Sequence, residues 1–177
     1  MRESVLVHTC CAPCAAYCFR KLTDEGFKIT GYFYNPNIHP EKEYRIRLGE
    51  LIRFSDKENH RLIVESDQAE VWFRAIKGFE LEKEGGKRCE LCFELRLEKA
   101  AKYAKQNGFD AFTTVLTISP HKNSNAINKI GKQTEEKYGI KYLEENFKKQ
   151  DGFRKSNEIS RQYGFYRQNY CGCVYSK

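Results

Sequence analysis

The stretch "SVLVHTCCAPCAAYC", residues 4–18, joins a short apolar run to a segment that holds four cysteines. Its first part, residues 4–9, is rich in β-branched residues and typical of a buried strand. The following part, residues 12–26, is typical of a helix, because Pro13 stands near its first turn and Gly26 closes it. The cysteines therefore fall where a strand ends and a helix begins.

The rest of the chain repeats this alternation of strand and helix. We expect further strands at residues 27–36, 61–66, 111–119 and 141–147. We expect further helices at residues 40–59, 68–80, 89–108, 124–139 and 156–164. Strands that alternate with helices form βαβ units, so the predicted fold is α/β, with a mostly parallel sheet and helices on both faces. No repeat, low-complexity stretch or linker divides the chain, which indicates a single domain over residues 1–177.

The composition limits the class of protein. The chain has 177 residues, enough for one domain with a sizeable core, and 40% of them are hydrophobic, as in globular proteins. No apolar run reaches membrane-spanning length and no signal peptide is recognisable, so we expect a cytoplasmic protein with no membrane partner. In that reducing compartment, eight cysteines favour metal binding or redox catalysis over structural disulfides.

The chain carries a moderate excess of positive charge. Its net charge is +7, from 31 Lys and Arg residues against 24 Asp and Glu residues. Such an excess is compatible with an ordinary solvated basic surface. It is equally compatible with a polyanionic partner, and RNA is the leading candidate.

Three loops of the predicted sheet are expected to meet at one edge, since ligands of parallel α/β sheets bind outside the carboxyl ends of the strands. The cysteine-rich segment follows the first strand, "YNPNIHP" (34–40) follows the second, and "SPHKN" (119–123) follows the fourth. In the last of these, Ser119, Lys122 and Asn123 suit contacts to phosphate or ribose. An ordinary polar turn is the alternative for this segment.

The first cysteine group consists of Cys10, Cys11, Cys14 and Cys18. A helix N-terminus lowers the pKa of a nearby thiol, and the thiolate is the form that binds metals. We therefore interpret Cys10, Cys11 and Cys14 as functional thiols, with inert core cysteines as the alternative. Cys18 lies one helical turn deeper than Cys14, so we interpret it as part of the buried packing.

The second group is the pair Cys89 and Cys92 in "RCELC", which follows a Gly-Gly loop and opens a predicted helix. A single C-x-x-C motif fits a redox dithiol, half of a zinc site or half of an iron–sulfur site. Together with Cys10 and Cys11, this pair provides four thiolates. Four thiolates satisfy either a zinc ion or a four-iron cluster.

The third group is the pair Cys171 and Cys173 in "YCGCVYS", near the end of the chain. Two thiols separated by one residue meet only with an unusual backbone, which Gly172 permits. We interpret them as a redox pair on a mobile chain end, with two further metal ligands as the alternative. The preceding "YRQNY" places Arg167 beside two tyrosines, which suits either RNA contact or cover for the core.

Four motifs together resemble one known family: "HTCCAPC", "RCELCFELRL", "FTTVLTISPHKN" and "YRQNYCGCVYS". They resemble epoxyqueuosine reductase of the QueH type, and the resemblance runs from Val5 to Ser176. It implies a three-layer sandwich of the PP-loop, or HUP-like, kind. It also implies reduction of epoxyqueuosine to queuosine at the wobble position of tRNA, the last step of queuosine biosynthesis, without cobalamin. The implied partners are tRNA that carries epoxyqueuosine and an electron donor.

The resemblance also divides the cysteines by role. Within a single catalytic domain, Cys171 and Cys173 would form a redox-active C-terminal pair. Cys14 has no place among the implied cluster ligands, and we expect it to serve catalysis by holding an additional mononuclear metal ion or by contacting the substrate. The implied cofactor is a [4Fe-4S] cluster, with the ligands Cys10, Cys11, Cys89 and Cys92.

Two other functions remain open on the sequence. An ATP-dependent PP-loop tRNA-modifying enzyme needs a Ser-Gly-Gly-rich phosphate loop after the first strand, where this chain has "HTCCAPC" without glycine. A zinc-stabilised RNA-binding module would explain four thiolates, but it would leave Cys171 and Cys173 without a role.

Overall fold

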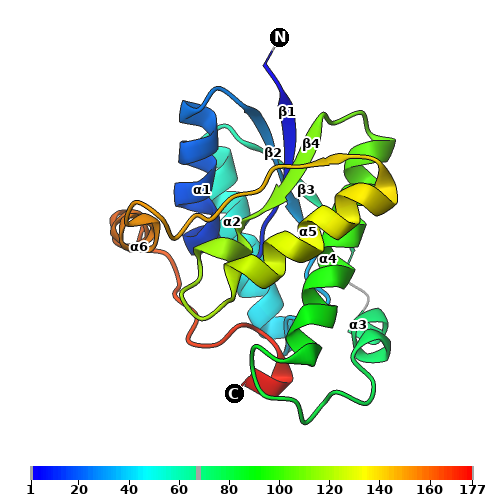
Figure 1. Cartoon of the computed structure of the whole chain (residues 1–177). Coiled ribbons are helices and arrows are strands. Elements are labelled where there is room, and N and C mark those ends of the chain that lie inside the picture. The colour runs from blue at the N-terminus through cyan, green and yellow to red at the C-terminus, as the bar shows by residue number, and fades with distance from the viewer. Residues whose placement is uncertain (1, 67–68, 177) are drawn as a thin grey trace.

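A computed structural model describes residues 2–66 and 69–176, and its centre is a five-stranded parallel sheet (Figure 1). The strands are β1 (Ser4–His8), β2 (Lys28–Phe33), β3 (Arg61–Val64), β4 (Ala111–Thr114) and β5 (Lys141–Tyr142). The helices are α1 (Ala12–Asp24), α2 (Glu41–Lys57), α3 (Ala69–Ala75), α4 (Lys87–Gln106), α5 (Ser124–Tyr138) and α6 (Gly152–Tyr163). Gln68, the first residue of the helix predicted for 68–80, lies outside the described residues.

Helices cover both faces of the sheet, so the molecule has three layers. Helices α1 and α2 pack together on one face, α4 and α5 pack together on the other, and α6 packs against α1 (Figure 1). Val5, Leu6 and Val7 of the central strand are fully buried, as a parallel sheet with two covered faces requires. The predicted α/β class with a parallel sheet is therefore confirmed.

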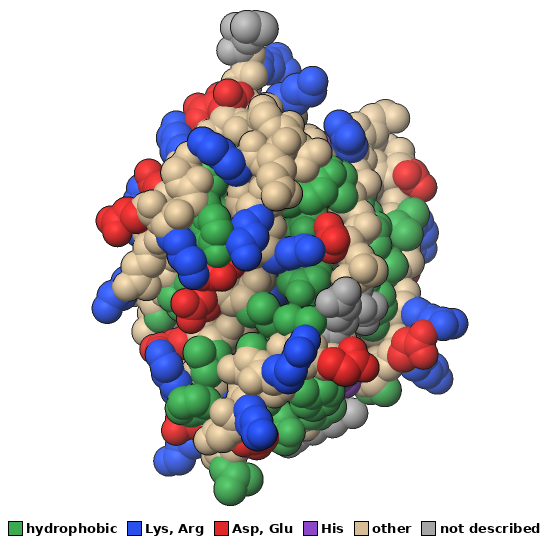
Figure 2. All heavy atoms as spheres, turned by 90° about the vertical axis from the view of Figure 1, so that its right-hand side faces the viewer, with side chains coloured by type: hydrophobic (Ala, Val, Ile, Leu, Met, Phe, Trp, Pro, Cys, Tyr) green, Lys and Arg blue, Asp and Glu red, His purple; other side chains and the backbone are tan. Residues whose placement is uncertain are grey.

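The surface over α3, α4 and α5 mixes side chains of every kind. Figure 2 shows lysines and arginines interspersed with acidic and apolar side chains on this face. The net charge of +7 is therefore not gathered into one basic patch here. Among the residues that the structure describes, no helix is both long enough and apolar enough to cross a membrane.

The strand order is β3-β2-β1-β4-β5, so the order in which the chain adds strands to the sheet changes direction beside β1. The chain runs outward from β1 through β2 to β3, and then returns to the other side of β1 at β4. Ligand sites of open α/β sheets lie at such a switch point, outside the carboxyl ends of the strands. His8 at the end of β1 pairs with Thr114 at the end of β4. The cysteine-rich loop and the segment after β4 therefore leave the sheet side by side.

The fourth strand is shorter than the predicted 111–119. It ends at Thr114, whose side-chain oxygen accepts a hydrogen bond from the backbone N–H of Leu116 at 3.2 Å. This side chain caps a short 3₁₀ helix, η1 (Val115–Ile118). Val115, Thr117 and Ile118 are β-branched and buried, as in a strand, but a local hydrogen bond turns the chain toward the site.

Two later elements also differ from the prediction. The strand predicted for 141–147 is limited to Lys141–Tyr142. The helix predicted for 156–164 begins earlier, at Gly152. A Cβ atom on Gly152 would lie only 1.7 Å from the carbonyl oxygen of Phe147, so the chain can pass this point only with glycine.

Candidate metal centre

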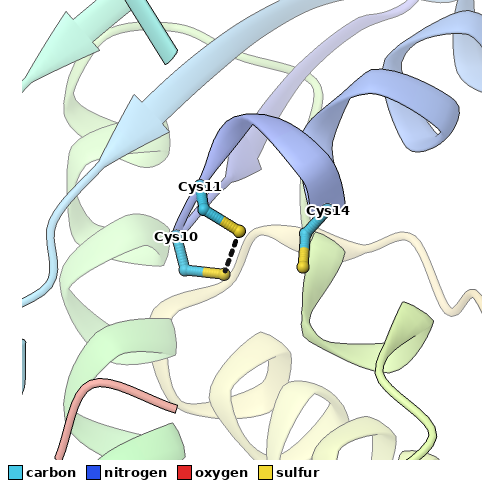
Figure 3. A group of neighbouring side chains, drawn as sticks. All are labelled: Cys10, Cys11 and Cys14. Carbon is cyan, nitrogen blue, oxygen red and sulfur yellow. Dashed lines mark hydrogen bonds between the residues drawn. The ribbon is translucent and has the colours of Figure 1, made fainter. Parts of the chain in front are cut away.

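Three thiols gather where β1 passes into α1 (Figure 3). Cys11 is the N-cap residue of α1 and has an extended backbone, and Cys14 follows one helical turn later. The three Sγ atoms lie within 4.8 Å of one another, and those of Cys10 and Cys11 are 3.8 Å apart. Cys10 and Cys11 are buried, and Cys14 is half-buried. Converging sulfur atoms of this kind form a suitable donor set for a soft metal ion. We call these residues the thiol trio.

The thiol trio shares its protons unequally. Hydrogen bonds from the thiols of Cys11 and Cys14 lower the pKa of Cys10 well below its usual range. The hydrogen bond to Cys10 raises the pKa of Cys11 to about 12 and also raises the pKa of Cys14. One thiolate beside two thiols results. Binding of a metal ion would release the remaining protons, because thiolates are the ligating form.

Cys18 lies outside this group. It is fully buried one turn further along α1, among the core residues. Burial raises the pKa of its thiol well above the usual range. The predicted place of Cys18 in the core is confirmed.

The second pair of thiols opens α4, as predicted. The Sγ atom of Cys89 accepts a hydrogen bond from the backbone N–H of Gly85 at 3.2 Å. Cys92 is buried against Trp72 and Cys173, and burial raises the pKa of its thiol. The buried indole N–H of Trp72 meets no oxygen or nitrogen acceptor in the described chain, and it favours the thiolate form of Cys92.

The third pair is docked against the body of the protein, whereas the sequence indicates a mobile chain end. Gly172, between Cys171 and Cys173, has a φ of +108°, which is a conformation that favours glycine. A Cβ atom there would lie 2.9 Å from the side chain of Ile38. The buried guanidinium of Arg47 donates a hydrogen bond to the carbonyl oxygen of Cys171 at 2.9 Å. Glycine and the buried arginine together fix this part of the tail.

The two tail thiols differ in acidity. A hydrogen bond from the thiol of Cys173 lowers the pKa of Cys171 to about 4, and the same bond raises the pKa of Cys173. The hydroxyl of Ser176 lies 3.2 Å from the Sγ atom of Cys171. Both cysteines are free thiols in the structure. A thiolate beside a thiol is the state from which a dithiol reacts.

This acidity predicts the pH dependence of alkylation. Because Cys171 is already a thiolate at neutral pH, we expect its rate of reaction with iodoacetamide to change little across the neutral range. In a Cys173→Ala variant the stabilising hydrogen bond is lost, so the rate should rise with pH as for an ordinary thiol. Mass spectrometry of the labelled tail peptide from reduced protein measures both rates. Equal pH dependence in the two proteins would contradict this arrangement.

The three cysteine groups meet at two adjoining cavities. A narrow cavity of about 40 Å³ is lined by thiols of every group, namely Cys10, Cys89, Cys92, Cys171 and Cys173. A wider cavity of about 360 Å³ adjoins it and is lined by Cys14. Residues that line both cavities include Cys10, Glu84, His121, Lys122 and Cys171. Asn37, from the loop after β2, lines the narrow cavity, so the predicted convergence of three loops is confirmed.

The polar residues predicted for this edge divide into two kinds. Ser119 and Arg167 line the wider cavity together with Lys122, so all three are placed to contact a ligand there. The side-chain oxygen of Asn123 instead accepts a hydrogen bond from the backbone N–H of Asn125 at 3.0 Å and caps α5. Asn123 therefore has a structural role in addition to its place at the narrow cavity.

Two buried arginines beside the C-x-x-C motif were not predicted. Arg96 is 3% exposed and donates from Nε to the carbonyl oxygen of Cys92 at 3.1 Å, and Arg88 is 2% exposed and donates to the carbonyl oxygen of Glu80 at 2.7 Å. Neither arginine forms an ion pair with a carboxylate within the part of the chain that the structure describes. Buried cations require anions nearby, and the thiolates of the narrow cavity can supply them. The sequence signal for these arginines was their position in "RCELCFELR", where Arg88 precedes Cys89 and Arg96 follows Cys92 by one helical turn.

Two solved structures share the fold. One is the U34-tRNA thiolase NcsA from Methanococcus maripaludis with its [4Fe-4S] cluster, with a TM-score of 0.61, 10% identity, and coverage of 99% of this chain and 62% of that one. The other is a predicted subunit of tRNA methyltransferase from Methanocaldococcus jannaschii, with a TM-score of 0.61, 11% identity, and coverage of 94% and 93%. At such low identity the likeness concerns the fold alone. It confirms the predicted three-layer α/β sandwich.

The similarity in sequence is far closer. A family model described as Epoxyqueuosine reductase QueH matches residues 5–177. Proteins of that name from Histophilus somni and Haemophilus influenzae are 47% and 46% identical over 175 residues, which cover 98% of this chain and 72% and 71% of theirs. The protein of that name from Thermotoga maritima is 38% identical and covers 98% of this chain and 90% of its own. The chain therefore belongs to the epoxyqueuosine reductase QueH family.

Proposed function

We propose that this chain reduces epoxyqueuosine to queuosine at the wobble position of tRNA, as an iron–sulfur enzyme that does not use cobalamin. Membership of the family supports the reaction. The observation that carries the mechanism is the convergence of three thiol groups on a narrow cavity beside a wider one. At about 360 Å³, the wider cavity falls within the range of small-molecule sites and suits a nucleoside turned out of the anticodon loop.

The thiols at and beside the narrow cavity suit a [4Fe-4S] cluster, because Cys10, Cys89 and Cys92 line the cavity and the Sγ atom of Cys11 lies 3.8 Å from that of Cys10. Such a cluster takes four thiolate ligands, and its net negative charge suits the two buried arginines, Arg88 and Arg96, which have no carboxylate partner among the described residues. When bound, the cluster supplies a one-electron donor and a Lewis acid. The proposed ligands are Cys10, Cys11, Cys89 and Cys92.

Cys14 completes the thiol trio without belonging to the proposed ligand set. Its Sγ atom lies within 4.8 Å of those of Cys10 and Cys11, and its side chain lines the wider cavity. This position supports two roles for Cys14, as a ligand of an additional mononuclear metal ion or as a contact to the bound nucleoside. Both roles place it where catalysis occurs.

The reduction balances with the tail dithiol as the source of electrons. Conversion of an epoxide to an alkene consumes two electrons and two protons and releases the oxygen as water. Because Cys171 is already a thiolate, its closure with the thiol of Cys173 to a disulfide releases two electrons and one proton, and the second proton comes from solvent. An external electron donor then restores the dithiol. Glu84 and His121 line both cavities and can relay protons between the thiols and the epoxide oxygen.

Anaerobic purification tests the proposed cofactor. We expect a brown protein with broad visible absorption and about four iron and four sulfide per chain, as a four-iron cluster requires. A colourless protein that holds zinc instead would contradict the proposal and favour the zinc-stabilised RNA-binding module. The apo protein reconstituted with iron and sulfide under the same conditions serves as the control.

The affinity for tRNA is expected to fall steeply with salt. A protein of net charge +7 that contacts phosphates releases counterions from RNA when it binds. An Arg167→Ala change at the wider cavity should lower the slope of log affinity against log salt by about one. Lys28→Ala, at the opposite end of the sheet, is the matched control and should leave the slope unchanged. Fluorescence anisotropy with labelled tRNA measures both; an affinity that does not depend on salt would argue against a basic docking surface.

A further inference from the structure

The side chain of Phe153 lines the wider cavity and is 38% exposed. It lies in the first turn of α6, a turn that the prediction from the sequence left out of the helix. The buried face of α6 consists of other residues, namely Gly152, Ser156, Ile159 and Ser160. Among the described residues, Phe153 belongs to neither of the two hydrophobic core clusters. The core therefore does not account for this aromatic ring in the cavity wall.

The part of α6 that carries Phe153 is tied to the helix that carries the thiol trio. The side-chain oxygen of Ser156 donates a hydrogen bond to the carbonyl oxygen of Pro13 at 2.6 Å, and Pro13 directly precedes Cys14. Helix α6 also packs against α1. Because Phe153 and Ser156 are one helical turn apart, these contacts hold the ring at a fixed place relative to the thiols.

The wider cavity has two ends of different chemistry. Cys10 and Cys171 line both cavities, so they mark a thiol end where the two cavities adjoin. Phe153 and Arg167 line the wider cavity but not the narrow one, and they mark an α6 end. The epoxide of epoxyqueuosine lies on a ring that a short linker joins to the base. Because the epoxide has to reach the thiols, the base is left at the α6 end.

A base that turns out of the anticodon loop gives up stacking on its neighbours, and proteins replace that stacking with an aromatic side chain. Tyr170 also lines the wider cavity, but its ring already lies beside the guanidinium of Arg47, 5.3 Å from the ring centroid. We propose that Phe153 is the platform on which the base of the wobble nucleoside stacks, so that the epoxide points toward the thiol end. This inference rests on the proposed function and names the residue that binds the base.

Arg167 lies at the same end of the cavity and suits the RNA backbone. Its Nη2 atom donates a hydrogen bond to the side-chain oxygen of Asn157 at 2.8 Å. Asn157 is neutral, and Arg167 forms no ion pair with a carboxylate in the described part of the chain. Its positive charge is therefore available to a phosphate beside the wobble nucleoside. The α6 end thus offers one group to the base and another to the backbone.

Binding of two tRNAs that differ only at the wobble position tests this role. One carries epoxyqueuosine, and the other has no base at that position. Phe153→Leu keeps an apolar side chain but removes the ring, so its affinity for the first tRNA should be about tenfold below that of the wild type, as for the loss of one stacked base. Its affinity for the second tRNA should be unchanged. Fluorescence anisotropy with anaerobically purified protein and labelled tRNA measures these affinities.

Three further variants separate stacking from other effects. Phe153→Tyr keeps the ring and should bind both tRNAs as the wild type does. Phe73→Leu removes an exposed ring on α3 that lines neither cavity, so as the matched control it should also bind as the wild type does. Arg167→Ala should lower the affinity for both tRNAs by the same factor, because its contact is to the backbone.

The outcomes separate the inference from the proposed function. Wild-type affinity of Phe153→Leu for the tRNA that carries epoxyqueuosine, or an equal loss of affinity for both tRNAs, would overturn the inference. A loss in Phe153→Tyr as large as in Phe153→Leu, or a wild-type protein that does not distinguish the two tRNAs, would also overturn it. Binding does not require turnover. A wild-type protein that binds the base through Phe153 but forms no queuosine would therefore contradict the proposed reaction alone.

Discussion

Replacement of a single proposed cluster ligand by alanine is expected to lower bound iron several-fold and to abolish the reduction of epoxyqueuosine. Removal of one thiolate leaves an incomplete ligand set, and metal sites of this kind depend on every ligand. At Cys92 the change also removes the thiolate that cluster binding would create near the buried guanidinium of Arg96. Iron and sulfide are measured in anaerobically purified protein. The prediction applies to Cys10, Cys11, Cys89 and Cys92.

Cys18 provides the matched control for these changes. It is a fully buried cysteine on α1, but it lies outside the thiol trio. Cys18→Ala should therefore keep its iron and lose only some stability, as expected for a small cavity in the core. Full iron in any one of the four ligand variants would remove that residue from the set. Loss of iron in Cys14→Ala, with Cys89→Ala unaffected, would point to the thiol trio as the metal site.

The double variant Cys171→Ala, Cys173→Ala is expected to keep its iron and colour but to lose repeated turnover. These thiols are proposed to supply the electron pair, so without them the cluster can be assembled but cannot complete the reaction with a chemical or enzymatic reductant. Val174→Ala, an exposed residue of the same tail, is the control and should turn over normally. Repeated turnover by the double variant would contradict the redox role.

Oxidation of the wild-type protein provides a second readout of the tail pair. The peptide that carries both cysteines should lose about two mass units, which are the two hydrogens released when a dithiol closes. If the double variant is instead colourless and free of iron, Cys171 and Cys173 are cluster ligands. The division of the eight cysteines into ligands and a redox pair would then be wrong.

Much of the fold and of the site follows from local sequence. The apolar run before Cys10 and the proline after Cys11 determine the strand and the helix start that bring those thiols to the carboxyl edge of the sheet. The rule for parallel sheets then places the loops after β1, β2 and β4 together. Gly172 between two cysteines indicates the unusual backbone that the structure has, with a positive φ.

The remaining features depend on contacts between distant parts of the chain. Gln168 and Cys11 are 157 positions apart, and no local pattern pairs them. Trp72 reads as an ordinary core residue of a short helix, but it lies against Cys92. The buried state of Arg96 also follows from packing, since an arginine on a helix that begins with exposed charges is usually solvated. These contacts supply the electrostatic and hydrogen-bonding environment of the site.

The central claim is tested most directly by the reaction itself. Protein purified and loaded with iron and sulfide without oxygen is incubated with tRNA that carries epoxyqueuosine, with a reductant and without cobalamin. The tRNA is then digested, and its nucleosides are identified by mass spectrometry. The account predicts that epoxyqueuosine disappears and that queuosine, with one oxygen fewer, appears in equal amount. Epoxyqueuosine that remains unchanged in the presence of fully loaded protein and an active reductant would contradict it.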